Sequence, residues 1–129
     1  MDRQHRRLFA GCSNRKLVVL DADNGHVVGV LPIGERVDGV AFDAPLQLVF
    51  SSNGDGTLTV IHEDAPDRFT VLENASTQVG ARTLALDETS GRVYLPTAEF
   101  GPPPPPTAER PHPRGSVLPG TFVVLEAGR

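Results

Sequence analysis

The sequence contains no tryptophan, a single cysteine and only 5% aromatic residues among its 129 positions. One cysteine cannot form a disulfide within the chain, so cysteine usage does not indicate a redox compartment. No run of about 18 apolar residues is present, which excludes a membrane-spanning helix. The apolar spacing of an amphipathic helix is also missing. Together these absences predict an all-β fold with a mainly aliphatic core.

Positive charge is scarce as well. The formal net charge is −4, so no domain-wide basic field exists and general binding to nucleic acid is not expected. A short basic patch at Arg3, His5, Arg6 and Arg7 is interpreted either as a solvated turn and strand edge or as a contact to an acidic partner. Because these charged residues come first, the apolar segment of a signal peptide is missing.

What the sequence does have is repetition. Residues 7–43 return about 45 positions later as residues 47–87, and a third, interrupted copy begins at Arg92. Each copy consists of short runs rich in Val, Leu, Ile and Phe that are closed by Gly, Asp, Asn or Pro, which is the pattern of strands and turns. A period of about 40 to 50 residues of this kind is typical of a β-propeller, in which each repeat forms one four-stranded blade.

Four kinds of run recur in the same order in these copies. They cover residues 7–10, 47–50 and 92–95; residues 17–21, 58–62 and 122–126; residues 27–31 and 69–72; and residues 39–43 and 83–87. The run from Leu17 to Leu20 is apolar at every position, which predicts a strand buried on both faces between two neighbouring sheets.

These runs predict a partial β-propeller of about two and a half four-stranded antiparallel blades. The expected blade parts are residues 1–35, with the last three strands of a blade, residues 36–78, with a complete blade over 37–72, and residues 79–129, with the first three strands of another. Seven blades need roughly 28 strands, so we expect the C-terminal part of a longer propeller. Its exposed blade edges are expected to associate with the missing blades or with another copy of the chain.

A proline-rich insertion at residues 101–120 interrupts the third copy. Five consecutive prolines begin at Pro102, and three more follow before Thr121. Proline has a fixed φ and no backbone donor, so this segment is predicted to be extended rather than paired in a sheet. Two interpretations remain: a stiff loop draped over the blade, or a recognition element for an aromatic-lined groove.

Three stretches carry a resemblance to a known family. The runs RRLFAGCSNRKLVVLDADNG, LQLVFSSNGDGTLTVI and GRVYLPTAEFGPPPPP resemble the YVTN-repeat, YncE-like seven-bladed β-propeller proteins of bacteria. The tetrad that names the repeat is replaced at its equivalent positions, residues 9–12, 49–52 and 94–97. The resemblance implies a ring whose strands run outward from a central channel, a periplasmic or other extracytoplasmic location, and in most members no assigned activity.

Candidate metal ligands are few and scattered. The four histidines lie in different repeats without ligand spacing, so no metal site is predicted; they are His5, His26, His62 and His112. The polar stretch from Ser51 to Gly56 imitates the start of a calcium loop, but its twelfth position is His62 and not glutamate. We therefore interpret this stretch as a hairpin turn.

Repeated acidic residues also have a structural interpretation. Asp43 and Asp87 end equivalent strands, and their recurrence in register favours a turn role over a catalytic pair. The best place for a ligand is the channel mouth, where the innermost strands begin. There Asp38 and Arg82 occupy equivalent positions in adjacent repeats and are our candidate ligand-binding residues.

Three classes of function remain. We favour a noncatalytic binding or scaffold module for an unknown protein or small-molecule partner, because a propeller offers a rigid surface and no catalytic constellation is recognisable in the sequence. The second class is a fragment of a propeller hydrolase or lactonase with a divalent metal at its channel mouth. The third is a fragment of a quinoprotein-like redox protein. Both alternatives need residues beyond this chain, and no cofactor is predicted for the chain itself.

Overall fold

A computed structural model describes residues 1–128, and within them every regular element is a β-strand. The first sheet contains β1 (Arg7–Cys12), β2 (Lys16–Asp21) and β3 (Val27–Pro32). The second contains β4 (Val37–Asp43), β5 (Leu48–Asn53), β6 (Thr57–Ala65) and β7 (Arg68–Ser76). The third contains β8 (Ala85–Asp87), β9 (Arg92–Thr97) and β10 (Val123–Ala127).

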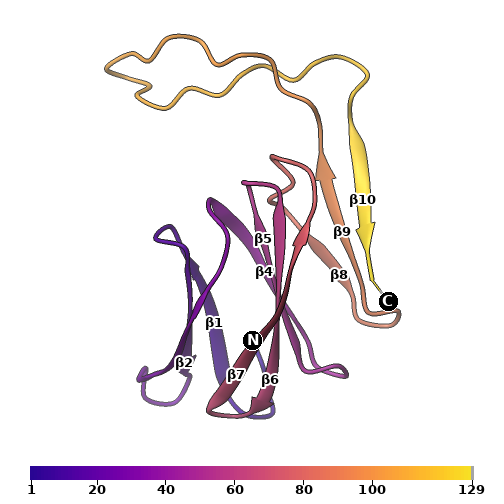
Figure 1. The fold of residues 1–129 in the computed structure, drawn as a ribbon. Helices are drawn as coiled ribbons and strands as arrows, with labels where there is room; N and C mark the ends of the chain where they lie inside the picture. The colour runs from indigo at the N-terminus through magenta and orange to yellow at the C-terminus, as the bar shows by residue number, and fades with distance from the viewer. Residues whose placement is uncertain (129) are drawn as a thin grey trace.

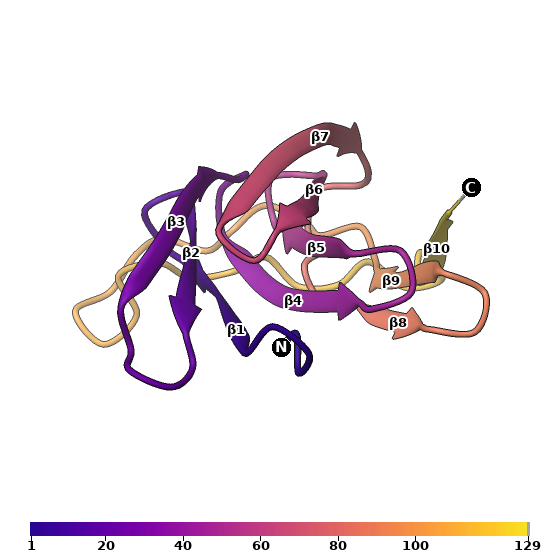
Figure 2. The same cartoon turned by 90° about the horizontal axis from the view of Figure 1, so that it is seen from below.

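Each sheet is antiparallel, and sequential strands are neighbours throughout, in the orders β1-β2-β3, β4-β5-β6-β7 and β8-β9-β10. Figure 2 shows the three sheets side by side, and β4 contacts both β1 and β8. The all-β, propeller-like prediction is confirmed: one four-stranded sheet lies between two three-stranded sheets. The fourth strand of the central sheet runs beyond the expected residue 72, to Ser76.

The core consists of two apolar clusters, one on each face of the central sheet. Between the first and second sheets lie Leu17, Val19, Phe42, Val49 and Ile61, with Phe9 stacked on Phe42 at a ring separation of 5.2 Å. Between the second and third sheets lie Leu48, Phe50, Leu58, Val93 and Leu95. Alternate side chains of a strand point to opposite faces of its sheet. Because both faces of the central sheet are covered by an apolar cluster, every residue of β5 is buried.

The expectation of burial on both faces is wrong for residues 17–20. Leu17 and Val19 are fully buried, but Val18 and Leu20 are only half-buried. The physical reason is that the first sheet packs against a neighbouring sheet on one face only. Two-sided burial is found instead in β5, whose sheet is covered on both faces.

The proline-rich segment forms a long excursion between β9 and β10, which Figure 1 shows extending across one end of the molecule. Its base is held by backbone hydrogen bonds from Gly101 N to Ser116 O at 2.8 Å and from Leu118 N to Glu99 O at 2.8 Å. Residues 102–112 are all exposed. As predicted, this stretch adds no strand to a sheet.

Candidate functional site

The two candidate residues from the sequence lie near the beginnings of β4 and β8. Asp38 is exposed, and its Oδ2 accepts a hydrogen bond from Thr83 Oγ1 at 3.1 Å. Arg82, the residue before Thr83, is half-buried, and its carbonyl accepts a hydrogen bond from the Ser52 hydroxyl. The structure therefore places Asp38 and the backbone of Arg82 in adjacent sheets at one end of the molecule. Their role in ligand binding stays a prediction.

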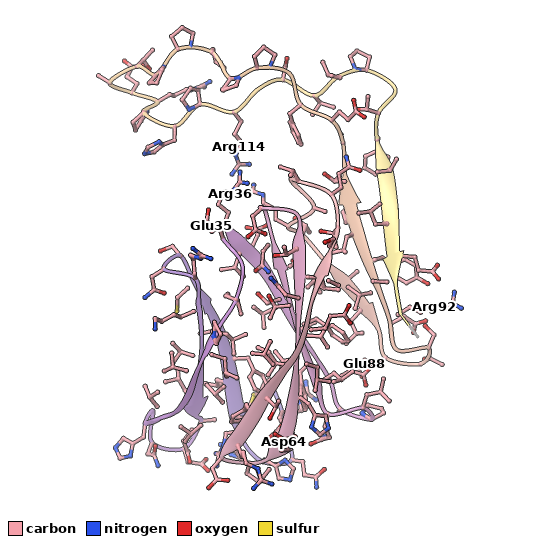
Figure 3. The ribbon with its side chains drawn as sticks, in the orientation of Figure 1. Glu35, Arg36, Asp64, Glu88, Arg92 and Arg114 are labelled. Atoms are coloured by element: carbon pink, nitrogen blue, oxygen red, sulfur yellow. The ribbon has the colours of Figure 1, made fainter. Side chains whose placement is uncertain are left out.

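A more densely charged site lies at the opposite end. Figure 3 shows Glu35 and Arg36, which precede β4, far from Asp64, which follows Glu63 in β6. Around Glu63, three side chains offer ligand atoms that all lie within 4.8 Å of one another: Asp2, His5 and Glu63. We call these three residues the acidic–histidine cluster.

The N-terminal turn supplies two members of this cluster. Asp2 and Arg7 form a backbone bridge, with N to O distances of 2.9 and 3.0 Å. The Asp2 carboxylate accepts hydrogen bonds from Gln4 N at 2.8 Å and from His5 N at 3.1 Å. Short aspartate side chains stabilise turns in this way. The same turn therefore orients the carboxylate and brings the His5 imidazole to it.

The central sheet supplies the third member. Glu63 lies near the end of β6, where the register with β7 shifts between Glu63 and Ala65. Such bulges change the direction of a side chain relative to a regular strand. Glu63 N donates a hydrogen bond to Gln47 O at 2.9 Å, and the residue is only 3% exposed. The strand thus holds a carboxylate in the interface between the first and second sheets.

The three side chains converge without satisfying one another. His5 Nδ1 lies 2.7 Å from Asp2 Oδ2 and 3.5 Å from Glu63 Oε1. Despite these short distances, His5 Nδ1 and both carboxylate oxygens of Glu63 are buried atoms without a hydrogen-bond partner among residues 1–128. Buried polar atoms are nearly always paired, so three such atoms on two neighbouring side chains require an explanation.

The electrostatics of Glu63 reflect its surroundings. Burial raises the pKa of Glu63, and the nearby Asp2 carboxylate raises this pKa further. His5 and, more weakly, Arg7 oppose this shift in the pKa of Glu63, and the hydrogen bonds of Arg7 go to Pro66 O at 2.6 Å and to Asp21 Oδ2 at 3.1 Å. Such a carboxylate either takes up a proton or binds a cation, because an isolated buried charge is costly.

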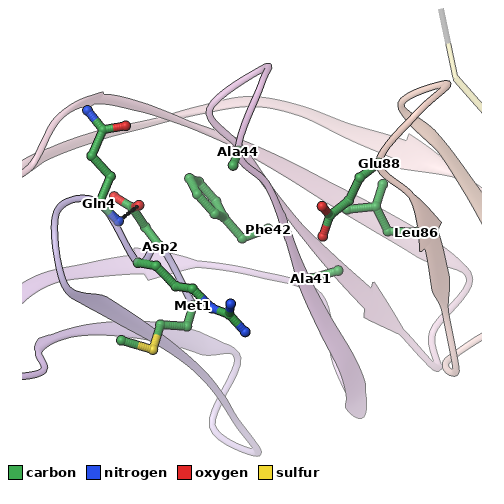
Figure 4. Close-up of a pocket in the computed structure, with 9 residues that line it drawn as sticks. Met1, Asp2, Gln4, Ala41, Phe42, Ala44, Leu86 and Glu88 are labelled. Atoms are coloured by element: carbon green, nitrogen blue, oxygen red, sulfur yellow. Dashed lines mark hydrogen bonds between the residues drawn. The ribbon is translucent and has the colours of Figure 1, made fainter.

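A hollow of about 680 Å³ adjoins the cluster (Figure 4). It lies between the N-terminal segment and the ends of β4 and β8, and its walls include Gln4, Phe42, Leu86 and Glu88. Asp2 belongs both to this wall and to the cluster. The hollow therefore offers a space for water or a small molecule beside the buried carboxylate of Asp2.

Asp2 and Glu63 are the residues of the cluster that the sequence analysis did not identify as candidates. Asp43 accepts a hydrogen bond from Leu46 N at 3.1 Å, and Asp87 accepts bonds from Thr89 N and the Ser90 hydroxyl, which confirms their predicted turn roles. Each of these aspartates stands five positions before its following strand, and Asp2 stands five positions before β1. This spacing was the available signal. Glu63 had none, because its burial depends on packing between sheets.

Hydrogen bonds and ion pairs bear on two other interpretations from the sequence. In the polar stretch from Ser51 to Gly56, Gly56 N donates to Asn53 O at 3.2 Å, which confirms a turn at the end of β5. In the basic patch, Arg6 Nη2 lies 2.6 Å from Asp23 Oδ1, and Arg7 Nη1 lies 3.1 Å from Asp21 Oδ2. Three of the four basic side chains thus lie beside a carboxylate of the same chain, because His5 Nδ1 also lies 2.7 Å from Asp2 Oδ2.

Within residues 1–128, no helix is long and apolar enough to cross a membrane. Comparison with known protein families, curated proteins and solved structures finds no match to this chain. Membership of the YVTN-repeat family therefore stays a prediction from the sequence.

Proposed function

We propose that this chain is a noncatalytic β-propeller segment, akin to the YVTN-repeat proteins, that acts as a binding or scaffold module through its two outer sheet faces. The observation that supports this function is the contrast between the central and flanking sheets. Every residue of β5 is buried, whereas Val30 in β3 is 51% exposed and Val124 in β10 is 54% exposed. Contiguous uncovered apolar surface is typical of interaction sites.

The edges of the flanking sheets support the same function. Strands β3 and β10 each pair on one side only, so each has a row of backbone donors and acceptors free to pair. Phe122 next to β10 is 68% exposed and Val27 in β3 is 58% exposed. A partner of suitable chemistry is therefore another antiparallel sheet with an apolar face, supplied by further blades or by a second copy of the chain.

The test measures association of the full chain by light scattering over a range of concentrations. We expect the average mass to rise with concentration. The variants Val30→Lys and Val124→Lys are each expected to shift the mass toward that of a monomer, because burying an unpaired lysine in an interface is unfavourable. Ser76→Lys is the matched control, since Ser76 is exposed on β7 at the outer edge of the central sheet.

Self-association would be contradicted if the chain had the mass of a monomer at every concentration and unfolded in one cooperative thermal transition. A second copy of the chain would then be excluded as the partner of the outer faces. Equal effects of the lysine at positions 30, 76 and 124 would show that added charge, and not the apolar faces, controls the mass.

A further inference from the structure

We propose that Asp2, His5 and Glu63 bind a divalent transition-metal ion of the zinc type between the first and second sheets. The ion would join the N-terminal turn to β6. This proposal is independent of the association function, because it concerns the inner interface and not the outer sheet faces.

The spacing of the ligand atoms is close to that of a tetrahedral metal site. Atoms bound at about 2.0–2.2 Å to a tetrahedral zinc ion lie roughly 3.3–3.6 Å apart. His5 Nδ1 and Glu63 Oε1 are 3.5 Å apart, within this range. His5 Nδ1 and Asp2 Oδ2 are 2.7 Å apart, so an ion would separate them by less than roughly 1 Å. The half-exposed imidazole makes this movement easy.

Charge balance also favours a divalent cation. Asp2 and Glu63 are 2% and 3% exposed, and their carboxylates share one small buried space. A single proton can neutralise one carboxylate, whereas a divalent cation balances both. Arg7 does not supply the missing charge, because its guanidinium donates to Pro66 O and Asp21.

The cluster has the supporting contacts that metal sites need. Ligating carboxylates are usually held in place by hydrogen bonds from outside the first shell. Asp2 has two such bonds, from the backbone amides of Gln4 and His5. The side chain of His5 is 28% exposed, which leaves a route for the ion from solvent. With three protein ligands, the fourth position of a tetrahedral ion is open to water.

The donor set selects the kind of ion. One imidazole nitrogen with two carboxylates suits zinc and its neighbours among the transition metals, whereas calcium and magnesium prefer oxygen ligands throughout. We therefore expect Zn²⁺ to bind at the cluster. Ca²⁺ is expected neither to bind there nor to displace bound Zn²⁺.

The experiment uses the full chain without a polyhistidine tag and titrates it with ZnCl₂ in a calorimeter. We expect one ion per chain and an unfolding temperature that rises with zinc concentration, because an ion that binds only the folded state stabilises it. Anomalous diffraction at the zinc edge should place the ion within bonding distance of His5 Nδ1, Asp2 and Glu63 Oε1.

Two variants test the ligands. Glu63→Gln keeps the shape of the side chain, removes the buried charge and should weaken zinc binding at least tenfold. His5→Asn should weaken binding to a similar extent, and it changes a half-exposed residue, so it decides the question if Glu63→Gln fails to fold. Without zinc, Glu63→Gln should unfold at the same temperature as the parent chain or a higher one.

The matched control is His62→Asn. His62 Nδ1 lies 2.7 Å from Asp64 Oδ1, and both residues are next to Glu63 in β6, so this partly exposed pair is a competing site for the ion. Zinc binding should survive this change. The proposal is overturned if zinc does not bind saturably, if the variants at positions 5 and 63 bind as tightly as the parent, or if His62→Asn abolishes binding.

Discussion

One side chain, the turn aspartate that precedes the second strand of a blade, meets three different environments in this chain. Asp2 lies beside Glu63 and His5, and Asp87 is exposed on a surface turn. Asp43 is fully buried, and its Oδ2 has no hydrogen-bond partner. Each of the three accepts a hydrogen bond from a backbone amide two or three residues further on, so the difference in their burial arises from what the neighbouring sheet places beside each turn.

Backbone conformation at a turn leads to a prediction for Arg15. Arg15 and Gly56 occupy equivalent turns with φ of 64° and 92°. A side chain in this left-handed region costs roughly 1 kcal/mol relative to glycine. Arg15→Gly is therefore expected to raise the free energy of unfolding by about 1 kcal/mol, measured by urea denaturation. The exposed ion pair from Arg15 Nη1 to Glu35 Oε1, at 3.3 Å, is worth little.

Arg15→Ala is the control for this prediction. It removes the same ion pair but keeps a Cβ in the left-handed conformation, so it should bring no gain. An equal stabilisation by alanine would assign the effect to the lost charge and not to the backbone.

The strands of the central sheet supply side chains to both core clusters. β5 and β6 supply Val49 and Ile61 to one cluster and Leu48, Phe50 and Leu58 to the other. Because β5 and β6 contribute to both clusters, loss of side-chain volume in these strands should weaken the packing of all three sheets. The flanking strands β3 and β10 contribute side chains to one core each.

This arrangement gives a prediction for two leucines of the central sheet. Leu58 in β6 is 2% exposed, so Leu58→Ala should lower the free energy of unfolding by about 2–5 kcal/mol through lost burial and an internal cavity. Leu72 in β7 is 50% exposed, and Leu72→Ala should change it by no more than about 0.5 kcal/mol. Chemical denaturation of both variants checks the contrast, and similar losses for the two would contradict the assigned faces.

Across the whole molecule, stability should be graded from the centre outward. The amides of β5 are hydrogen-bonded to strands on both sides and covered on both faces, whereas β8 spans only Ala85–Asp87 and β10 lies at an edge. Hydrogen exchange followed by mass spectrometry should therefore show the slowest exchange in β5 and the fastest strand exchange in β8 and β10. Uniform protection of all three sheets would show that the chain unfolds only as one unit.

Local patterns predicted most of the architecture. Short aliphatic runs closed by turn residues repeat with a constant period, so the strands, their order and the interruption at residues 101–120 could be recognised without coordinates. The turn roles of Asp43 and Asp87 followed from their recurrence in register. In each case the interactions that form the strand pair or the turn join residues close in sequence, so a local sequence pattern is enough to predict them.

The environment of a side chain between sheets could not be obtained in this way. Residues 17–20 are apolar throughout, yet only the face of β2 toward the central sheet is fully buried. Asp2 and His5 meet Glu63 because packing of the first sheet on the second brings a turn against a bulged strand. Contacts between residues so far apart in sequence depend on the direction and distance of packed sheets, which no local run of residues encodes.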